Sequence, residues 1–230
     1  MSQLLVTDLG RISYQDALAR QGSLVERLKD VRVNEAHLLL LEHDPPVITL
    51  GRRGRTEHIL ASDNTLADEG IEVHRCTRGG EVTYHGPGQL VGYPIVRLRA
   101  GGWGVRRYVA DLERMLILVL GRLGLHGGRR EGRAGVWVGE KKVASIGVAV
   151  SRPVAYHGFA LNVATDLKHT RYIVPCGAPD CTTTTISRLL QANIDISKVK
   201  GLLVECFCEV LGFRARFSQD AVGEKSNERA

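Results

Sequence analysis

The chain has 230 residues and a formal net charge of +6 at pH 7, with 43% hydrophobic and 24% charged side chains. This length suffices for one large hydrophobic core, and the composition excludes a disordered chain, a collagen-like repeat and a disulfide-stapled miniprotein. Two features need an explanation: the positive charge, and the 26 glycines, which exceed the usual frequency of ~7%.

The first half of the chain alternates apolar segments with one amphipathic helix. Short apolar runs predict strands at residues 4–9, 37–42, 47–50, 71–77 and 90–98. Ser13 is a suitable N-cap and Asp16 lies in the following turn, which predicts a helix from there to about Arg32. Asp44-Pro45-Pro46 forces a turn between the second and third strands.

The second half begins with the clearest helix of the sequence. Apolar side chains at i, i+3 and i+4 spacing predict a helix over 105–125, which ends at a glycine pair. Strands at 135–138, 143–150 and 154–163 follow with short turns, so this part of the sheet is expected to be antiparallel, with a hairpin turn at 138–141. A last helix is predicted over 197–211. We therefore expect one α+β domain with a mixed sheet over 1–217, and a polar, disordered tail over 218–230.

The cysteines indicate a reducing compartment. There are five, an odd number, and none of their spacings is that of a zinc site: Cys76, Cys176, Cys181, Cys206 and Cys208. The N-terminus lacks the pattern of a signal peptide, and no apolar stretch is long enough to cross a bilayer. The sequence predicts a cytoplasmic protein without a metal site and without a membrane segment.

One glycine-rich segment lies between two predicted strands. Residues 78–89 read RGGEVTYHGPGQ, with four glycines in twelve residues. The spacing fits neither a Walker loop nor a dinucleotide fingerprint. A long hairpin loop is one interpretation, but Arg78, Tyr84 and His85 cluster where a bare turn requires none of them, which favours a functional loop.

Three further segments combine small residues or a thiol with predicted strands. KVASIG at 142–147 and HGFALN at 157–162 carry small side chains, which leave a groove on a sheet or let a helix pack closely. In IVPCG at 173–177 an apolar strand is expected to end at a bend that exposes Cys176. The hydroxyl-rich residues 182–187 lead into a helix, whose N-terminus would lower the pKa of a nearby thiol. Cys176 is therefore a candidate nucleophile, with buried filler as the alternative.

These four segments occur in the same order in lipoyl(octanoyl) transferases, and the sequence resembles that family from about residue 4 to 213, including GRRG at 51–54. The resemblance implies the fold of biotin and lipoate protein ligases and of the class II tRNA synthetase catalytic domain. The sequence departs from the family pattern at Ala178 and at the pair Thr184-Thr185, two conservative changes that affect the shape of the expected slot and not the chemistry, and at Cys181. Cys181 is expected to be filler, with an oxidative disulfide to Cys176 as the alternative.

The resemblance also implies a reaction and its residues. The family transfers an octanoyl group from acyl carrier protein to a lysine of lipoyl domains, such as those of 2-oxoacid dehydrogenase complexes or glycine cleavage protein H, without ATP or another cofactor. It assigns the acyl-thioester nucleophile to Cys176 and the general base to Lys142. The implied substrate-binding residues are Arg78, Gly79, Gly80, Glu81, Val82, Thr83, Tyr84, His85, Ser145, Ile146, Gly147, Gly158, Phe159 and Ala160.

Elementary chemistry agrees with this assignment and leaves several points open. A lysine at its ordinary pKa of about 10.4 is protonated, so it can act as a base only if burial lowers that pKa. Alternatively, the pair rests as thiolate and ammonium. Lys141 competes with Lys142 for the role. The oxyanion donors are expected from the backbone of Cys176–Gly177 or of Gly79–Gly80. Arg78 has two expected uses, substrate binding or pairing with an internal acid, and His85 either holds the glycine loop or lines the acyl slot.

Two other functions are weighed against this one. An ATP-dependent lipoate or biotin ligase on the same fold needs no catalytic cysteine, so the IVPCG segment argues against it. Residues 97–133 hold nine arginines against three acids, which could suit nucleic acid, but no recognition motif accompanies them. We expect the positive charge to serve acidic protein partners, which acyl carrier proteins are, and expect no nucleic acid or membrane partner.

Overall fold

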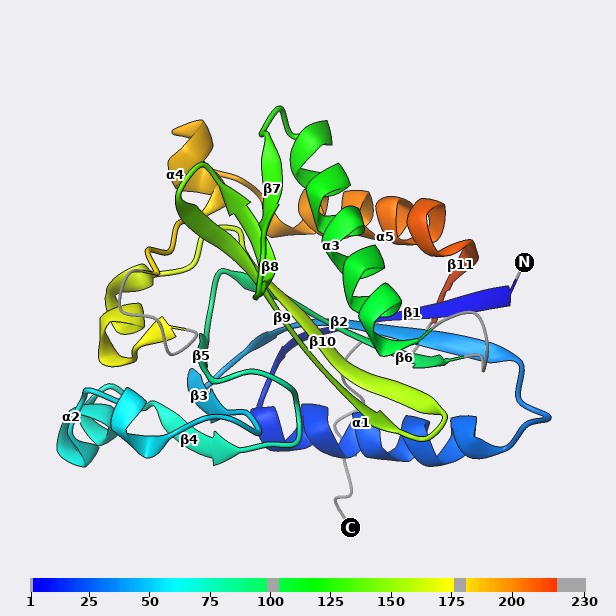
Figure 1. The fold of residues 1–230 in the computed structure, drawn as a ribbon, viewed down its shortest axis with the longest axis horizontal. Helices are drawn as coiled ribbons and strands as arrows, with labels where there is room; N and C mark the ends of the chain where they lie inside the picture. Colours follow the sequence, from blue (N-terminus) through cyan, green and yellow to red (C-terminus); the bar gives the residue numbers. More distant parts are fainter. Residues whose placement is uncertain (1, 99–103, 176–180, 219–230) are drawn as a thin grey trace, which may run out of the picture.

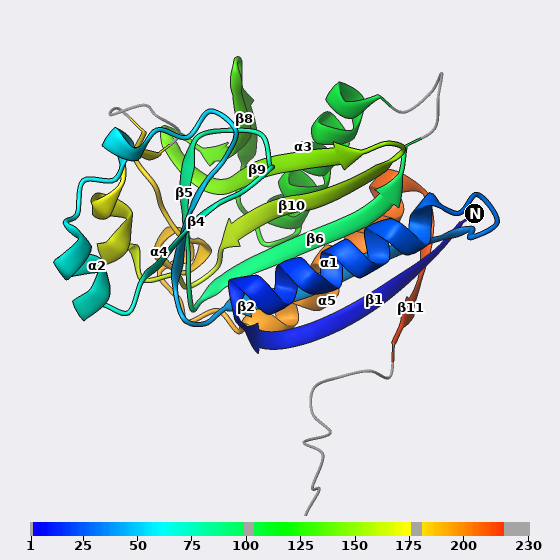
Figure 2. The ribbon, with the colours of Figure 1, turned by 90° about the horizontal axis from the view of Figure 1, so that it is seen from below.

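A computed structural model describes residues 2–98, 104–175 and 181–218. Its main layer is an eight-stranded mixed sheet with the order β11-β1-β2-β6-β10-β9-β8-β7, shown in Figures 1 and 2. The strands of this sheet are β1 (Ser2–Ile12), β2 (Glu35–His43), β6 (Gln89–Arg97), β7 (Gly127–Arg130), β8 (Arg133–Val138), β9 (Lys141–Ser151), β10 (Val154–Asn162) and β11 (Phe213–Phe217).

Helices cover both faces of this sheet, α1 (Tyr14–Lys29) on one face and α3 (Val105–Arg122) with α5 (Ile196–Leu211) on the other (Figure 1). Strand β2 reads as an unbroken leucine run because both of its faces are buried. Leu38 and Leu40 join the core cluster that holds α3 and α5, whereas Leu39 and Leu41 join the cluster that holds α1. The period of two along the strand thus divides one apolar run between two cores.

A smaller sheet lies at one end of the main sheet and supplies part of the site (Figure 2). It has the order β4-β3-β5, from β4 (Glu72–Arg75), β3 (Val47–Leu50) and β5 (Val82–His85). The short elements of the chain are α2 (Asp63–Asp68), α4 (Ile186–Leu190) and the 3₁₀ helices η1 (Thr56–His58) and η2 (Leu167–Tyr172). A separate core cluster joins α2 and this small sheet to Ile173, just beyond η2.

Most predicted elements are confirmed, and the differences have physical reasons. Ser13 caps α1 by accepting from the Asp16 N–H, and β8, β9 and β10 are antiparallel neighbours joined by the expected hairpins. The glycine-rich segment is not one long loop, because residues 82–85 form β5 against β3. The expected strand before Cys176 is wrong: η2 ends at Tyr172, directly before that segment, and Ile173 makes only an isolated bridge to Ile59.

Two strands were missed because their residues carry little strand signal by themselves. β7 has the sequence GGRR, and β11 follows directly on the last helix, where it pairs in parallel with β1. In both cases tertiary pairing outweighs local propensity. The predicted disordered tail lies outside the described residues from position 219 onwards, and no helix within the described ranges is long and apolar enough to cross a membrane.

Close approach between β6 and β10 depends on two glycines. A Cβ at Gly92 would overlap the ring of Phe159, and a Cβ at Gly158 would overlap the backbone of Gly92. The aromatic ring therefore lies over a strand that has no side chain at that point. This packing lets β10 carry Phe159 into the cavity described below without widening the sheet.

Candidate active site

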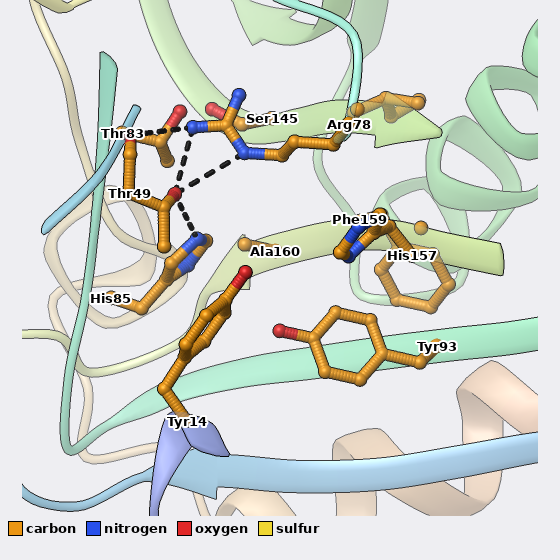
Figure 3. A pocket seen from close by; sticks show the side chains of 13 residues that line it. Tyr14, Thr49, Arg78, Thr83, His85, Tyr93, Ser145, His157, Phe159 and Ala160 are labelled. Atoms are coloured by element: carbon orange, nitrogen blue, oxygen red, sulfur yellow. Dashed lines mark hydrogen bonds between the residues drawn. The ribbon is translucent and has the colours of Figure 1, made fainter. Parts of the chain in front are cut away.

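Two adjoining cavities open between the main sheet and the small sheet. The inner cavity encloses about 390 Å³ and is lined by Tyr14, Thr49, Arg78, Thr83, His85, Tyr93, Ser145, Ile146, Gly147, His157, Gly158, Phe159 and Ala160, most of which are labelled in Figure 3. The second, here called the lysine cavity, encloses about 410 Å³ and is lined by Val82, Thr83, Tyr84, Gln89, Lys142, Ser145, Asn162, Thr170, Ile173, Pro175 and Thr183. Thr83 and Ser145 line both, so the two cavities meet there.

Lys142 is the cation of the lysine cavity. It is the second residue of β9 and is only 3% exposed, whereas its neighbour Lys141 points to the other side of the strand and is exposed. Its Nζ donates to the carbonyl oxygen of Ala134 at 3.1 Å and lies 5.0 Å from the centroid of the Trp137 ring. The alternation of a β-strand thus selects Lys142 over Lys141 for any role inside the cavity.

The backbone of Lys142 fixes the segment that follows residue 180. Its N–H donates to the Thr182 carbonyl at 2.8 Å, and its carbonyl accepts from the Thr184 N–H at 2.9 Å. On the other side of the gap, Pro175 lines the same cavity as Lys142. Cys176 and Gly177 lie outside the described residues, but the chain on both sides of them borders the lysine cavity.

The inner cavity has apolar and small-residue walls on β9 and β10. Ile146 and Phe159 supply apolar surface, and Gly147, Gly158 and Ala160 keep the space between them open. Gly147 has a second use, because a Cβ there would lie 2.8 Å from the Gly79 carbonyl oxygen and 3.0 Å from Cδ of Arg78. The glycine therefore lets residues 78–79 pack directly on β9.

Arg78 is buried at the edge of the inner cavity and is held by Thr49 (Figure 3). Its Nη2 donates to the backbone carbonyl and to Oγ1 of Thr49, both at 2.7 Å, and its Nη1 donates to the Gly79 carbonyl at 3.1 Å. None of these acceptors is a carboxylate. The described contacts therefore do not support the alternative that Arg78 pairs with an internal acid. The guanidinium brings positive charge to a cavity that is otherwise uncharged.

His85 both lines the inner cavity and holds the glycine-rich segment in place. Its Nδ1 donates to Oε1 of Gln89 at 2.7 Å, and Gln89 donates in turn to Oδ1 of Asn162 at 2.9 Å. Asn162 donates to the Thr184 carbonyl at 3.1 Å. Burial lowers the pKa of His85 well below its ordinary value, so the ring is neutral. This chain of hydrogen bonds connects the wall of the inner cavity to Thr184, in the segment that pairs with the backbone of Lys142.

Two tyrosines, Tyr14 and Tyr93, bring hydroxyl groups to the inner cavity. The Tyr93 hydroxyl donates to Nε2 of His43 at 2.7 Å, and burial lowers the pKa of His43 to about 4, so this nitrogen is free to accept. The Tyr14 hydroxyl is buried beside the Cys76 thiol, and burial raises its pKa above the ordinary value. Both hydroxyl groups point into the cavity in Figure 3.

Sequence reasoning missed four residues of the inner cavity: Tyr14, Thr49, Tyr93 and His157. Tyr14, Thr49 and Tyr93 come from segments that carry no motif, and only the fold brings them to the site, whereas His157 begins the HGFALN segment but was not among the expected binding residues. The backbone φ of His157 is +55°, in the left-handed region, which local sequence does not reveal for a non-glycine residue.

Three of the expected binding residues do not line either cavity: Gly79, Gly80 and Glu81. The Gly79 N–H donates to the Val148 carbonyl at 2.9 Å, so its expected use as an oxyanion donor is wrong. Glu81 faces Arg53 and His58. Within residues 2–98, 104–175 and 181–218, no group of three or more His, Cys, Asp or Glu side chains comes together to hold a metal ion.

Comparison with known proteins identifies relatives over most of the chain. The family described as lipoyl protein ligase A/B catalytic domain matches residues 13–208. An octanoyltransferase of Solibacter usitatus is 49% identical, covering 85% of this chain and 88% of its own. One of Alkaliphilus metalliredigens is 42% identical, covering 91% and 96%. The match to an octanoyltransferase of Myxococcus xanthus, at 44% identity, covers 91% of this chain but 60% of that longer protein.

Solved structures with a similar fold include ligases. Lipoate-protein ligase A bound with ATP superimposes with a TM-score of 0.77 at 17% identity, covering 96% of this chain and 90% of that chain. A biotin protein ligase from Aquifex aeolicus gives a TM-score of 0.51 at 15% identity, covering 92% of this chain and 70% of that chain. These similarities confirm the predicted fold class.

The buried histidines predict a pH dependence of stability. Burial, and secondarily the charge of Arg78, lowers the pKa of His157 from 6.5 to about 4. Above pH ~6.5 the ring is neutral in both states. Between pH 6.5 and 4 the unfolded chain binds a proton that the folded chain does not, so stability falls by up to about 1.4 kcal/mol per pH unit for this ring.

His157→Asn tests this prediction, because asparagine tolerates the left-handed backbone. Urea unfolding at several pH values from 7 to 4.5 should give a shallower loss of stability on acidification for the variant than for the wild type. An equal loss of stability per pH unit in the variant and the wild type would contradict the lowered pKa of His157.

Proposed function

Because the chain belongs to the lipoyl protein ligase A/B catalytic-domain family, we propose that it transfers an octanoyl group from acyl carrier protein to a lysine ε-amine of a lipoyl domain. Its closely similar relatives are named octanoyltransferases, so it is an acyltransferase of protein lipoylation. The observation that carries the proposal is the cavity around Lys142, which the chain borders on both sides of Cys176 and which continues into the apolar inner cavity.

In the first proposed step, the sulfur of Cys176 attacks the thioester carbonyl carbon of the donor. A carbon–sulfur bond forms to Cys176, the bond to the phosphopantetheine sulfur breaks, and that thiol leaves with a proton. Lys142 is the group that either takes the Cys176 proton or, as an ammonium, stabilises the resting thiolate. Its contacts with the Trp137 ring and the Ala134 carbonyl hold the amino group in place for either role.

In the second proposed step, the acceptor lysine attacks the acyl-enzyme. The amine nitrogen forms an amide bond, the bond to the sulfur of Cys176 breaks, and one amine proton returns to the thiol through Lys142. The first step exchanges one thioester for another and is nearly balanced in energy, while the second runs downhill to an amide. The pair of steps therefore requires neither ATP nor a metal, which separates it from the alternative of an ATP-dependent ligase.

The inner cavity is the proposed binding site of the acyl chain. A chain attached beside Lys142 passes Thr83 and Ser145, lies between Ile146 and Phe159, and ends at Tyr14 and Tyr93. Burial of each methylene contributes roughly 0.8 kcal/mol, so the length of the cavity can select the length of the chain.

The proposed partners are proteins. The donor is acyl carrier protein, and the acceptors are lipoyl domains of 2-oxoacid dehydrogenase complexes and glycine cleavage protein H. Exposed arginines close to the site support this, since Arg52, Arg53 and Arg55 lie on the loop after β3, next to the glycine-rich segment. Positive charge there would attract an acidic carrier protein.

The first prediction of this proposal concerns the covalent intermediate. Incubation with octanoyl-acyl carrier protein, without ATP, should add one octanoyl group to the protein, as measured by intact mass. Hydroxylamine should remove the group, and Cys176→Ala should prevent its formation. An adduct that forms only with ATP would favour the ligase.

The second prediction uses the adjacent lysines as a matched pair. Lys142→Ala should keep the fold but lose transfer activity by about 100-fold or more, because it removes the proton-transfer group. Lys141→Ala, at the exposed neighbouring position, should retain activity within about twofold, because a surface substitution there removes nothing from the cavity. Transfer rates of the two variants, with circular dichroism to check folding, decide the matter; full activity of Lys142→Ala would rule out its role.

The third prediction concerns chain length. Tyr14→Ala should lengthen the inner cavity, and the ratio of kcat/KM for decanoyl to octanoyl donor should rise about tenfold, since two more methylenes become buried. Tyr14→Phe removes the hydroxyl and keeps the ring that limits the cavity, so its ratio should stay that of the wild type. An unchanged ratio in Tyr14→Ala would place the end of the acyl chain elsewhere.

A further inference from the structure

A polar cluster lies behind the wall of the lysine cavity, away from the proposed reacting atoms. Glu69, the C-cap of α2, accepts from Nζ of Lys168 at 2.9 Å, from Nε2 of His169 at 3.0 Å and from the Tyr172 hydroxyl at 3.2 Å. All three donors belong to η2. One carboxylate at the end of α2 thus holds the whole 3₁₀ helix η2.

The cluster continues from Glu69 to the cavity itself. A carboxylate can only accept, so Nε2 of His169 donates to Glu69, and Nδ1 on the other side of the ring forms a hydrogen bond with the Tyr84 hydroxyl at 2.8 Å. Tyr84 lines the lysine cavity, and burial raises its pKa, so the hydroxyl is protonated and able to donate. A Cβ at Gly86 would overlap this hydroxyl, so only glycine fits at position 86 with Tyr84 in this orientation.

Charge complementarity orders this cluster. Hydrogen bonds, first from Lys168 and then from His169, lower the pKa of Glu69 from 4.5 to about 2, so the carboxylate is ionised at any physiological pH. His169 is buried, whereas about a third of the Glu69 side chain is exposed. An ionised acceptor with three donors is a stronger and more directional support than a neutral contact of the same size.

The helix held in this way leads directly into the proposed nucleophile. Thr170, Ile173 and Pro175 line the lysine cavity, and Pro175 immediately precedes Cys176. Beyond the cluster, the end of η2 is supported by backbone hydrogen bonds from Leu60 to the Tyr172 carbonyl, at 2.7 Å, and from Val174 to the His58 carbonyl, at 2.8 Å. These bonds keep the segment folded if the cluster is broken, but they leave its distance from Lys142 less tightly fixed.

We propose that Glu69 and His169 are positioning residues: acting on η2 and Tyr84, they fix the wall from Thr170 to Pro175 against Lys142 and so set the rate of acyl transfer. The inference rests on the proposed function, because it takes Cys176 as the nucleophile. Neither residue lines the lysine cavity or the inner cavity. Their effect is therefore expected on the chemical steps and not on the binding of the donor.

Glu69→Gln and His169→Phe test this proposal, alone and together. Each single variant should lose about tenfold to 100-fold in kcat, since a small misplacement of reacting groups has effects of that size. The KM for octanoyl-acyl carrier protein should stay within about twofold, because donor binding is untouched. If Glu69 acts through His169, the double variant should be no slower than the slower single variant.

The control is Glu205→Gln on α5, which removes an ion pair with Arg122 across the helices of the far face, at 3.1 Å. It matches Glu69→Gln in chemistry and should leave kcat unchanged. If His169→Phe fails to fold, the surface-accessible Glu69→Gln decides alone through its kcat and KM. An unchanged kcat, a rise in KM alone, or losses that multiply in the double variant would each overturn the proposal.

Cys176→Ala separates this inference from the proposed function. If Cys176→Ala retains transfer, the proposed function itself is wrong. If Cys176→Ala is inactive while the Glu69 and His169 variants have normal kcat, the reaction stands and the positioning role is wrong.

Discussion

The site depends on one backbone contact, the pairing of Lys142 with Thr182 and Thr184. The same residue offers its side chain to the cavity and its main chain to the segment after residue 180. A β-strand residue can do both because its side chain and its backbone groups point in perpendicular directions. The proposed base and the chain beyond the proposed nucleophile therefore share one anchor, and the distance between them is set by a ladder rather than by flexible side chains.

The two sheets contribute different halves of the chemistry. The main sheet supplies Lys142 and the apolar walls on β9 and β10, while the small sheet supplies Tyr84, His85 and the support of η2. Hydrogen bonds cross between them where β5 meets β6, from Nδ1 of His85 to Oε1 of Gln89 and from Nε2 of Gln89 to the Tyr84 carbonyl. Fixed polar bridges of this kind hold a reacting geometry more accurately than apolar contacts alone, since hydrogen bonds are directional.

The sequence predicted the fold class, most strands and the motif residues because these depend on local patterns: apolar periodicity, N-caps and short signatures. It could not predict Tyr14, Tyr93 or His157 as cavity residues, since only the packing of α1, β6 and β10 brings them together. It also offered the Gly79–Gly80 backbone as one of two possible sources of oxyanion donors, and the N–H of Gly79 is used elsewhere. A glycine-rich motif reports that backbones approach closely, but whether the N–H faces a ligand or another strand is decided by tertiary pairing, here with Val148.

The inner cavity is lined by the buried Tyr14 and Tyr93 and adjoins the lysine cavity at Thr83 and Ser145. Under the proposed reaction, an acyl chain bound there is attached at the lysine cavity, and both protein substrates must reach the same thioester. The carrier protein must therefore depart before the lipoyl domain can approach the thioester. The two partners then exclude one another, and the enzyme alternates between a free form and an acylated form in a ping-pong cycle. Each protein substrate reacts with one of these forms and acts as an inhibitor when it binds the other.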